Sequence, residues 1–142
     1  MKQVSILTLF SLVFFCSCSS PKKEDIIGVW LSNDISRFQF NNDSTFIVAD
    51  MPESILFGHY ASKKLFSGSG VWDIQYLENA WKIELIFPKS DDLPGGFACY
   101  LNIEKKFHFR KSTWSLFFYG ENFDYKYEFK PTNLTKSSKT KH

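Results

Sequence analysis

The sequence has few of the residues that catalytic and metal-binding proteins rely on. It contains three histidines in 142 residues, His59, His108 and His142. They lie on separate segments with no metal-ligating residue two positions away, whereas a metal site needs three or four converging ligands. Nucleophile-elbow, zinc-protease and phosphate-loop motifs are also missing. We therefore expect no cofactor, no metal and no enzymatic activity.

A strong charge of one sign is also missing from the central region. Between residues 26 and 130, eleven Lys and Arg stand against thirteen Asp and Glu, a net charge of about −2. The basic excess lies at the two ends of the chain, at Lys22-Lys23 and beyond residue 135. A nucleic-acid-binding domain concentrates its basic residues on the folded part. We therefore expect no nucleic-acid partner.

No apolar run reaches the ~20 residues that a membrane-spanning helix needs, but a shorter run stands near the N-terminus. Lys2 precedes about 12 largely apolar residues from Val4 to Phe15, and the segment closes on Phe15-Cys16-Ser17-Cys18. This ending resembles a lipobox, the cleavage site of bacterial lipoprotein signal peptides. The resemblance implies a signal peptide over residues 1–17 and lipidation of Cys18, followed by a linker over residues 18–25.

The same resemblance implies a place in the cell. Acyl chains such as palmitate on Cys18 would anchor the protein in the bacterial cell envelope, and Ser19, in place of Asp, favours the outer membrane. The periplasmic and surface faces both stay open. An ordinary secretory signal and an uncleaved anchor are the alternatives. With Cys16 removed and Cys18 acylated, Cys99 is left without a disulfide partner, and we interpret it as a small buried hydrophobic residue.

Between Ile26 and Lys130 apolar residues recur at period two, and turn clusters interrupt them every 8–12 residues. This pattern is typical of antiparallel strands, and we expect no helix there. The first hairpin, over residues 71–87, turns at Glu78-Asn79. It pairs Trp72 with Leu85, Ile74 with Ile83 and Tyr76 with Trp81.

Two more hairpins are expected. One covers residues 37–49, turns at residues 42–44, and pairs Phe38 with Val48 and Phe40 with Phe46. The other covers residues 105–118, turns at Lys111-Ser112, and pairs Phe109 with Trp114 and Phe107 with Leu116. Further strands are predicted over residues 55–62, 97–103 and 125–129, a loop over 88–96, and a bulge at Gly68-Ser69-Gly70.

These segments predict an all-β fold, an antiparallel meander of about eight strands that closes into a small barrel. A β-sandwich is the alternative. The 125 residues after the signal peptide correspond to one domain, over residues 26–130. The remaining tail, residues 131–142, is polar and is expected to be disordered. The stretch Trp114 to Tyr119 is apolar on both faces and needs cover on both.

Three short motifs accompany this pattern, Ile27-Gly28-Val29-Trp30, the hairpin Phe40–Phe46 and the strand Gly68–Ile74. Together they resemble the lipocalin-like (calycin) domains of small uncharacterised bacterial lipoproteins. The resemblance implies a lipocalin-like barrel in which Trp30 plugs the closed end. It supplies no ligand and no catalytic residue.

We expect the protein to be a non-enzymatic lipoprotein that binds a small apolar ligand or lipid inside its barrel. The alternative is a protein-interaction, inhibitor or immunity-type module with a solid barrel and binding loops such as Asp91–Gly96, whose partner would be an envelope protein. The first hypothesis needs inward-facing walls. The residues assigned to them as ligand-binding are Trp72, Ile74, Trp81, Ile83, Phe107, Phe109 and Trp114.

Overall fold

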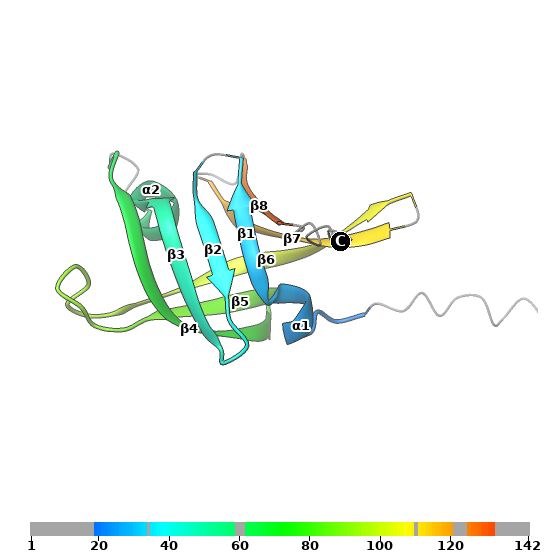
Figure 1. Cartoon of the computed structure of the whole chain (residues 1–142), viewed down its shortest axis with the longest axis horizontal. Helices are drawn as coiled ribbons and strands as arrows, with labels where there is room; N and C mark the ends of the chain where they lie inside the picture. Colours follow the sequence, from blue (N-terminus) through cyan, green and yellow to red (C-terminus); the bar gives the residue numbers. More distant parts are fainter. Residues whose placement is uncertain (1–18, 34, 59–61, 110, 121–124, 133–142) are drawn as a thin grey trace, which may run out of the picture.

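Eight antiparallel strands close into a single barrel in the computed structural model, with each strand paired to the next and β8 paired to β1 (Figure 1). The structure describes residues 19–33, 35–58, 62–109, 111–120 and 125–132. The predicted eight-stranded meander barrel is confirmed, and the sandwich alternative is wrong. The strands are β1 Gly28–Ser32, β2 Arg37–Phe40, β3 Thr45–Pro52, β4 Leu65–Leu77, β5 Ala80–Phe87, β6 Phe97–His108, β7 Lys111–Tyr119 and β8 Lys126–Pro131; the helices are α1 Lys23–Ile26 and α2 Glu53–Phe57.

The first two predicted hairpins are confirmed in register. Glu78 and Asn79 connect β4 to β5 with φ angles of 53° and 60°, the positive values that a two-residue hairpin turn of type I′ requires. Between β2 and β3, residues 42–44 form a three-residue turn in which Ser44 has φ 64°, closed by a 2.9 Å hydrogen bond from the N–H of Asn41 to the carbonyl of Thr45. The predicted cross-strand pairs are all present: Trp72 with Leu85, Ile74 with Ile83, Tyr76 with Trp81, Phe38 with Val48 and Phe40 with Phe46.

The predicted register of the third hairpin is wrong. Phe107 lies opposite Ser112, four residues from its predicted partner, and Lys105 lies opposite Trp114. The chain turns after His108, because only this register places the core residue Leu116 opposite Ile103 inside the barrel. A shift of four residues preserves the alternation of faces. It moves Phe107 and Phe109 to the tip of the hairpin.

The strand predicted over residues 55–62 is wrong, and so is the expectation of no helix. The five residues Glu53–Phe57 form α2, which buries Leu56 and ends at Gly58, a left-handed residue with φ 70°. A glycine in this conformation is a common helix C-terminus. Residues 59–61 of the predicted strand lie outside the described residues. Neither described helix has the length and apolarity needed to cross a bilayer.

The bulge predicted at residues 68–70 is also wrong. β4 runs unbroken through these residues, and the register shift falls instead on β3 between Val48 and Met51, where Asp50 has φ 53°. Gly70 has a different role. A Cβ there would lie 2.1 Å from the carbonyl oxygen of Ile86, so β4 passes too close to the β5 backbone to carry a side chain.

Aromatic rings pack the interior of the barrel. The ring centre of Phe38 lies 5.1 Å from that of Phe129, 5.5 Å from Phe40, 6.1 Å from Phe46 and 6.4 Å from Phe118. All five side chains are buried. Distances of this size are those of rings in direct contact. The space around Phe38 is therefore occupied by protein.

Phe117 is buried on the outside of the barrel. It lies on the outer face of the stretch Trp114 to Tyr119, which is apolar on both faces and therefore needs cover on the outside as well. Its side chain is 5% exposed although it points away from the core residues Leu116 and Phe118. The Nζ of Lys126 lies 4.2 Å from the centre of the Phe117 ring, and the Tyr119 ring lies 5.1 Å away. Side chains of β7 and β8 therefore contribute to this cover.

The N-terminal helix is fastened to the barrel. Ile26 of α1 is fully buried, and its carbonyl accepts a 2.7 Å hydrogen bond from the indole of Trp30. Lys23 forms a 3.1 Å ion pair with Asp73 of β4 and donates a hydrogen bond to Ser44 at 2.9 Å. The segment predicted as a linker is thus in part a helix packed on the barrel.

Candidate functional site

The seven residues predicted to face inward have different positions. Trp72 and Ile83 are buried in the core, and Ile74 and Trp114 are half-buried against it. Trp81 is half-buried too, but its ring lies 4.9 Å from that of Tyr76, which is 57% exposed. For Phe107 and Phe109 the inward prediction is wrong, because they are 77% and 111% exposed.

The inward residues pack the core instead of lining an open chamber. The indole of Trp72 lies 5.2 Å from the ring of Phe40 in an edge-on contact, and its N–H donates to the carbonyl of Asn41 at 3.3 Å. Both the apolar surface and the polar atom of this side chain are therefore already engaged.

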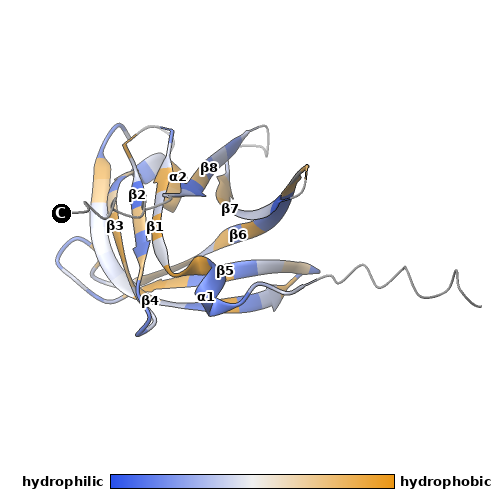
Figure 2. Ribbon diagram, turned by 45° about the vertical axis from the view of Figure 1, so that its right-hand side comes forward, coloured by the Kyte–Doolittle hydropathy of each residue, from blue (hydrophilic) through white to orange (hydrophobic). Residues whose placement is uncertain are grey.

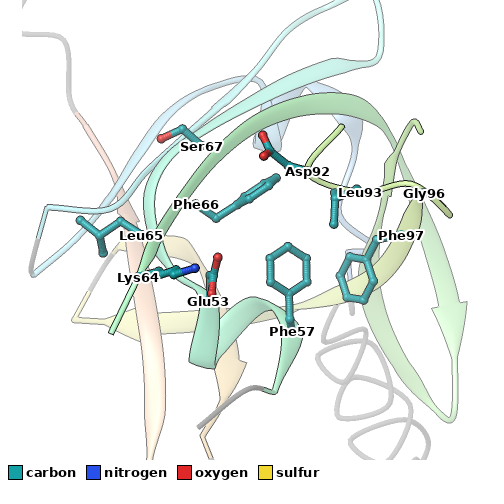
Figure 3. Close-up of a pocket in the computed structure, with 10 residues that line it drawn as sticks. All are labelled: Glu53, Phe57, Lys64, Leu65, Phe66, Ser67, Asp92, Leu93, Gly96 and Phe97. Atoms are coloured by element: carbon teal, nitrogen blue, oxygen red, sulfur yellow. The ribbon is translucent and has the colours of Figure 1, made fainter. Parts of the chain in front are cut away.

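A pocket of about 580 Å³ lies elsewhere, where α2 meets the loop between β5 and β6 (Figure 3). Its size falls within the range of small-molecule sites. It draws residues from α2, from the start of β4, from the loop and from the start of β6. The lining residues are Glu53, Phe57, Lys64, Leu65, Phe66, Ser67, Asp92, Leu93, Gly96 and Phe97.

Three phenylalanines form an apolar wall of this pocket. The Phe57 ring lies 5.1 Å from Phe66 and 4.8 Å from Phe97, both at steep interplanar angles. Edge-to-face contacts of this kind are favourable and directional. Phe66 also contacts the buried Phe87 at 5.5 Å, and Phe87 contacts Phe46 of the core at 5.0 Å. The wall is therefore continuous with the packed interior.

Charged groups stand at the rim. Figure 3 shows Glu53 and Lys64 on one side of the pocket and Asp92 on the other. Glu53 accepts a 2.7 Å hydrogen bond from Ser62, and its backbone N–H donates to the carbonyl of Lys64 at 3.0 Å. Within the described ranges, the Asp92 carboxylate forms no ion pair. Two carboxylates against one ammonium leave the rim with a net negative charge.

Backbone hydrogen bonds hold the loop that carries Asp92. Ser90 and Leu93 exchange two backbone hydrogen bonds of 3.0 and 3.1 Å, and Gly96 donates to the carbonyl of Leu93 at 2.9 Å. Leu93 in turn packs against the core. The loop predicted over residues 88–96 therefore has a defined shape, and the position of Asp92 on the pocket rim follows from it.

Sequence reasoning missed this pocket because α2 was read as a strand. A strand over residues 55–62 does not predict that Phe57 lies beside a loop more than thirty residues further along the chain. The available signal was Gly58, a helix-terminating residue directly after Glu53-Ser-Ile-Leu-Phe57. Asp91 and Asp92 begin the loop that the alternative hypothesis assigns to partner binding. Both residues are exposed, and only Asp92 lines the pocket.

Within the part of the chain that the structure describes, the remaining candidate residues form no second reactive or metal-binding cluster. Burial raises the pKa of the Cys99 thiol to about 12, which keeps it protonated and unreactive. Cys18, His59 and His142 lie outside the described residues. Among those that are described, no group of three His, Cys, Asp or Glu side chains converges on one point.

No family model matches the chain, and no curated protein or solved structure is significantly similar to it.

Proposed function

We propose that the protein is a lipoprotein of the bacterial cell envelope that binds a small amphipathic molecule at the mouth of its barrel. The observation that carries this proposal is the 580 Å³ pocket, with its wall of three phenylalanines and its charged rim. The lipobox-like ending at Cys18 supports the anchor. The motif around Trp30 supports a lipocalin-like relationship.

The two parts of the pocket indicate the chemistry of the ligand. An aliphatic or aromatic body would lie against Phe57, Phe66 and Phe97, where burial of apolar area contributes ~25 cal/mol per Å². A cationic or hydrogen-bond-donating head group would face Glu53 and Asp92. Lys64 adds a partner for an anionic group on the same head, so a zwitterion also fits.

Binding without chemistry is the simplest use of this site. None of the described residues that line it is a cysteine or a histidine. Ser67 supplies a hydroxyl, but that oxygen accepts a 3.0 Å hydrogen bond from the backbone N–H of Asp50. Nucleophilic catalysis needs a hydroxyl activated by an adjacent base. We therefore propose a carrier or sensor in place of an enzyme.

A second candidate function, a protein-interaction module, is favoured by the packed interior around Phe38. A solid barrel needs no internal ligand. In that case a side chain of an envelope protein would enter the pocket at the mouth, and the loop over residues 88–96 would supply the surrounding contacts.

Native mass spectrometry of the full-length, lipidated protein separates the two candidates. We expect a small molecule that stays bound under native conditions and is released under denaturing conditions. Asp92→Asn should lower its occupancy several-fold, whereas Asp91→Asn, next to it but outside the pocket, should leave occupancy unchanged. A ligand-free protein, or equal occupancy in both variants, would contradict the carrier proposal and favour the interaction module.

A further inference from the structure

An exposed aromatic hairpin lies far from the pocket. β6 begins at the pocket residue Phe97 and ends at His108, so its far end lies roughly 36 Å along the strand at ~3.3 Å per residue. The β6–β7 hairpin extends past the barrel (Figure 1), and its tip is coloured as hydrophobic in Figure 2. Phe107 and Phe109 there are 77% and 111% exposed.

Phe109 is unfavourable in water for two reasons. Its ring is fully exposed, and its backbone has φ 50°. Bulky residues rarely adopt positive φ, which in hairpin turns is usually left to Asn, Asp or Gly. A large apolar ring at a strained, protruding position suits contact with an apolar phase. In a turn that faces only water, the exposed Phe109 ring would contact nothing apolar.

The N-terminal chain arrives at this same hairpin. Lys105 of β6 donates a 2.5 Å hydrogen bond to the hydroxyl of Ser19, the residue after Cys18. Pro21 is buried, and Lys23 is paired with Asp73. Only Ser19 and Ser20 therefore separate Cys18 from the packed chain. Three peptide units of 3.8 Å place the Cα of Cys18 within ~11 Å of the Cα of Pro21.

We propose that the β6–β7 tip is a membrane-contacting surface, with Phe107 and Phe109 inserted into the bilayer interface beside the acyl chains of Cys18. This inference rests on the lipidation that the proposed function includes. Acyl chains on a tether this short hold the bilayer surface at the end of the barrel where the hairpin extends.

The charges around the tip fit a lipid surface. The Nζ of Lys105 lies 5.7 Å from the centre of the Phe107 ring and 5.3 Å from that of Trp114. Lys105 precedes Phe107 along β6 and so lies closer to the barrel than the tip does. With the tip in the bilayer, the Phe107 ring would lie among the acyl chains and the Lys105 ammonium at the level of the phosphates, the usual arrangement at a bilayer boundary. Arg110 and Lys111 follow in the sequence, so anionic head groups are favoured.

A second hairpin extends in the same direction. Figure 2 shows the β4–β5 and β6–β7 hairpins extending past the barrel on one side. Tyr76 near the β4–β5 tip is 57% exposed and contacts the Trp81 ring. Tyrosine and tryptophan are enriched at membrane–water interfaces. With both hairpins at the bilayer, the pocket at the other end of the barrel would face the aqueous phase.

Spin labelling tests this orientation on the full-length, lipidated protein in vesicles of phosphatidylethanolamine and phosphatidylglycerol. A label is placed at Phe109→Cys, and the matched control is Asp91→Cys on the exposed loop near the pocket. The partly buried thiol of Cys99, whose pKa is raised to about 12, is poorly reactive toward the reagent. Collisions of each label with oxygen and with a water-soluble nickel complex report its depth.

We expect the ratio of oxygen to nickel collisions to be several-fold higher at position 109 than at position 91. Phe107→Cys should give the same result and serves if the first variant folds poorly. Equal ratios at both ends would overturn the proposal. A label at 109 shielded from both reagents would also overturn it, in favour of a protein partner.

The anchor is judged separately on the same samples. The mass of the N-terminal peptide shows whether Cys18 carries acyl chains. If it carries none, the anchor in the proposed function is overturned. The label at position 109 still tests the hairpin when vesicles are present. A label that lies in the bilayer supports membrane contact by the hairpin, and a label that lies in water contradicts it.

Discussion

The indole N–H of Trp30 donates a hydrogen bond to the backbone carbonyl of Ile26, 2.7 Å away, and both residues are buried. This contact joins β1 to the helix that precedes it. Together with the Lys23–Asp73 ion pair, it makes α1 part of the folded barrel. Only Ser19 and Ser20 separate Cys18 from the buried Pro21, so under the proposed lipidation this contact would help to set the orientation of the barrel on a membrane.

Trp30→Phe should keep an aromatic ring in the core while removing the hydrogen bond and part of the buried ring volume. The carbonyl of Ile26 would then be buried without its partner, which costs about 1–3 kcal/mol of unfolding free energy. Urea unfolding measures the loss. Trp81→Phe is the control, because Trp81 is half-buried and lies outside the core cluster. Equal losses in both variants would show that the Ile26 contact is not a specific source of stability.

Gly70→Ala should destabilise the barrel by about 1–3 kcal/mol, because the added methyl group would lie 2.1 Å from the carbonyl oxygen of Ile86. Either β4 or β5 has to move. Thermal unfolding of the variant and the parent protein measures the change in unfolding free energy. Gly95→Ala is the matched control, since a Cβ there meets nothing within 4 Å. A Gly70→Ala protein as stable as the control would mean that β4 does not need to pass this close to β5.

Glu128 should make stability depend on acid pH. Desolvation alone would raise its pKa, but hydrogen bonds from Lys106 and Ser115 hold the pKa below its ordinary value of 4.5. A carboxyl group whose pKa is lower in the folded protein stabilises the fold above its unfolded pKa. That contribution is lost as the pH falls below 4.5 through the folded pKa.

Glu128→Gln should therefore flatten the decrease in unfolding free energy between neutral pH and pH values below 4.5. Urea unfolding at several pH values measures the slope. Glu24→Gln is the control, because Glu24 is exposed on α1. An unchanged slope in Glu128→Gln would assign the acid sensitivity to other carboxyl groups.

Cys18→Ser should release the protein from membranes, because serine cannot form the thioether that carries the acyl chains. Fractionation of cells and immunodetection measure the distribution. Cys16→Ser is the matched control, since this cysteine precedes the expected cleavage site and would be discarded with the proposed signal peptide. Release of both variants, or retention of Cys18→Ser, would contradict lipidation at Cys18.

Local chemistry explains which parts of the fold could be predicted. The register of the β4–β5 hairpin follows from strict alternation on both sides of Glu78-Asn79, because a slip of one residue would expose every apolar side chain. The β6–β7 register was wrong because the sequence around Lys111-Ser112 is polar over several residues, so the turn had no unique position. The packing of Leu116 in the core, opposite Ile103, fixes the register of this hairpin.

The sequence by itself determined most of the strand pattern, two of the three hairpin registers and the lipobox-like segment, because each depends on residues close together in the chain. The exception is the predicted strand over residues 55–62, part of which forms α2. The tertiary structure decided which residues of an apolar face lie inside. Alternation assigns Trp72 and Phe107 to inward faces, but two hairpins extend past the closed part of the barrel, so one ring is buried and the other exposed. The pocket, too, required the closed barrel, which brings α2 beside a loop distant in sequence.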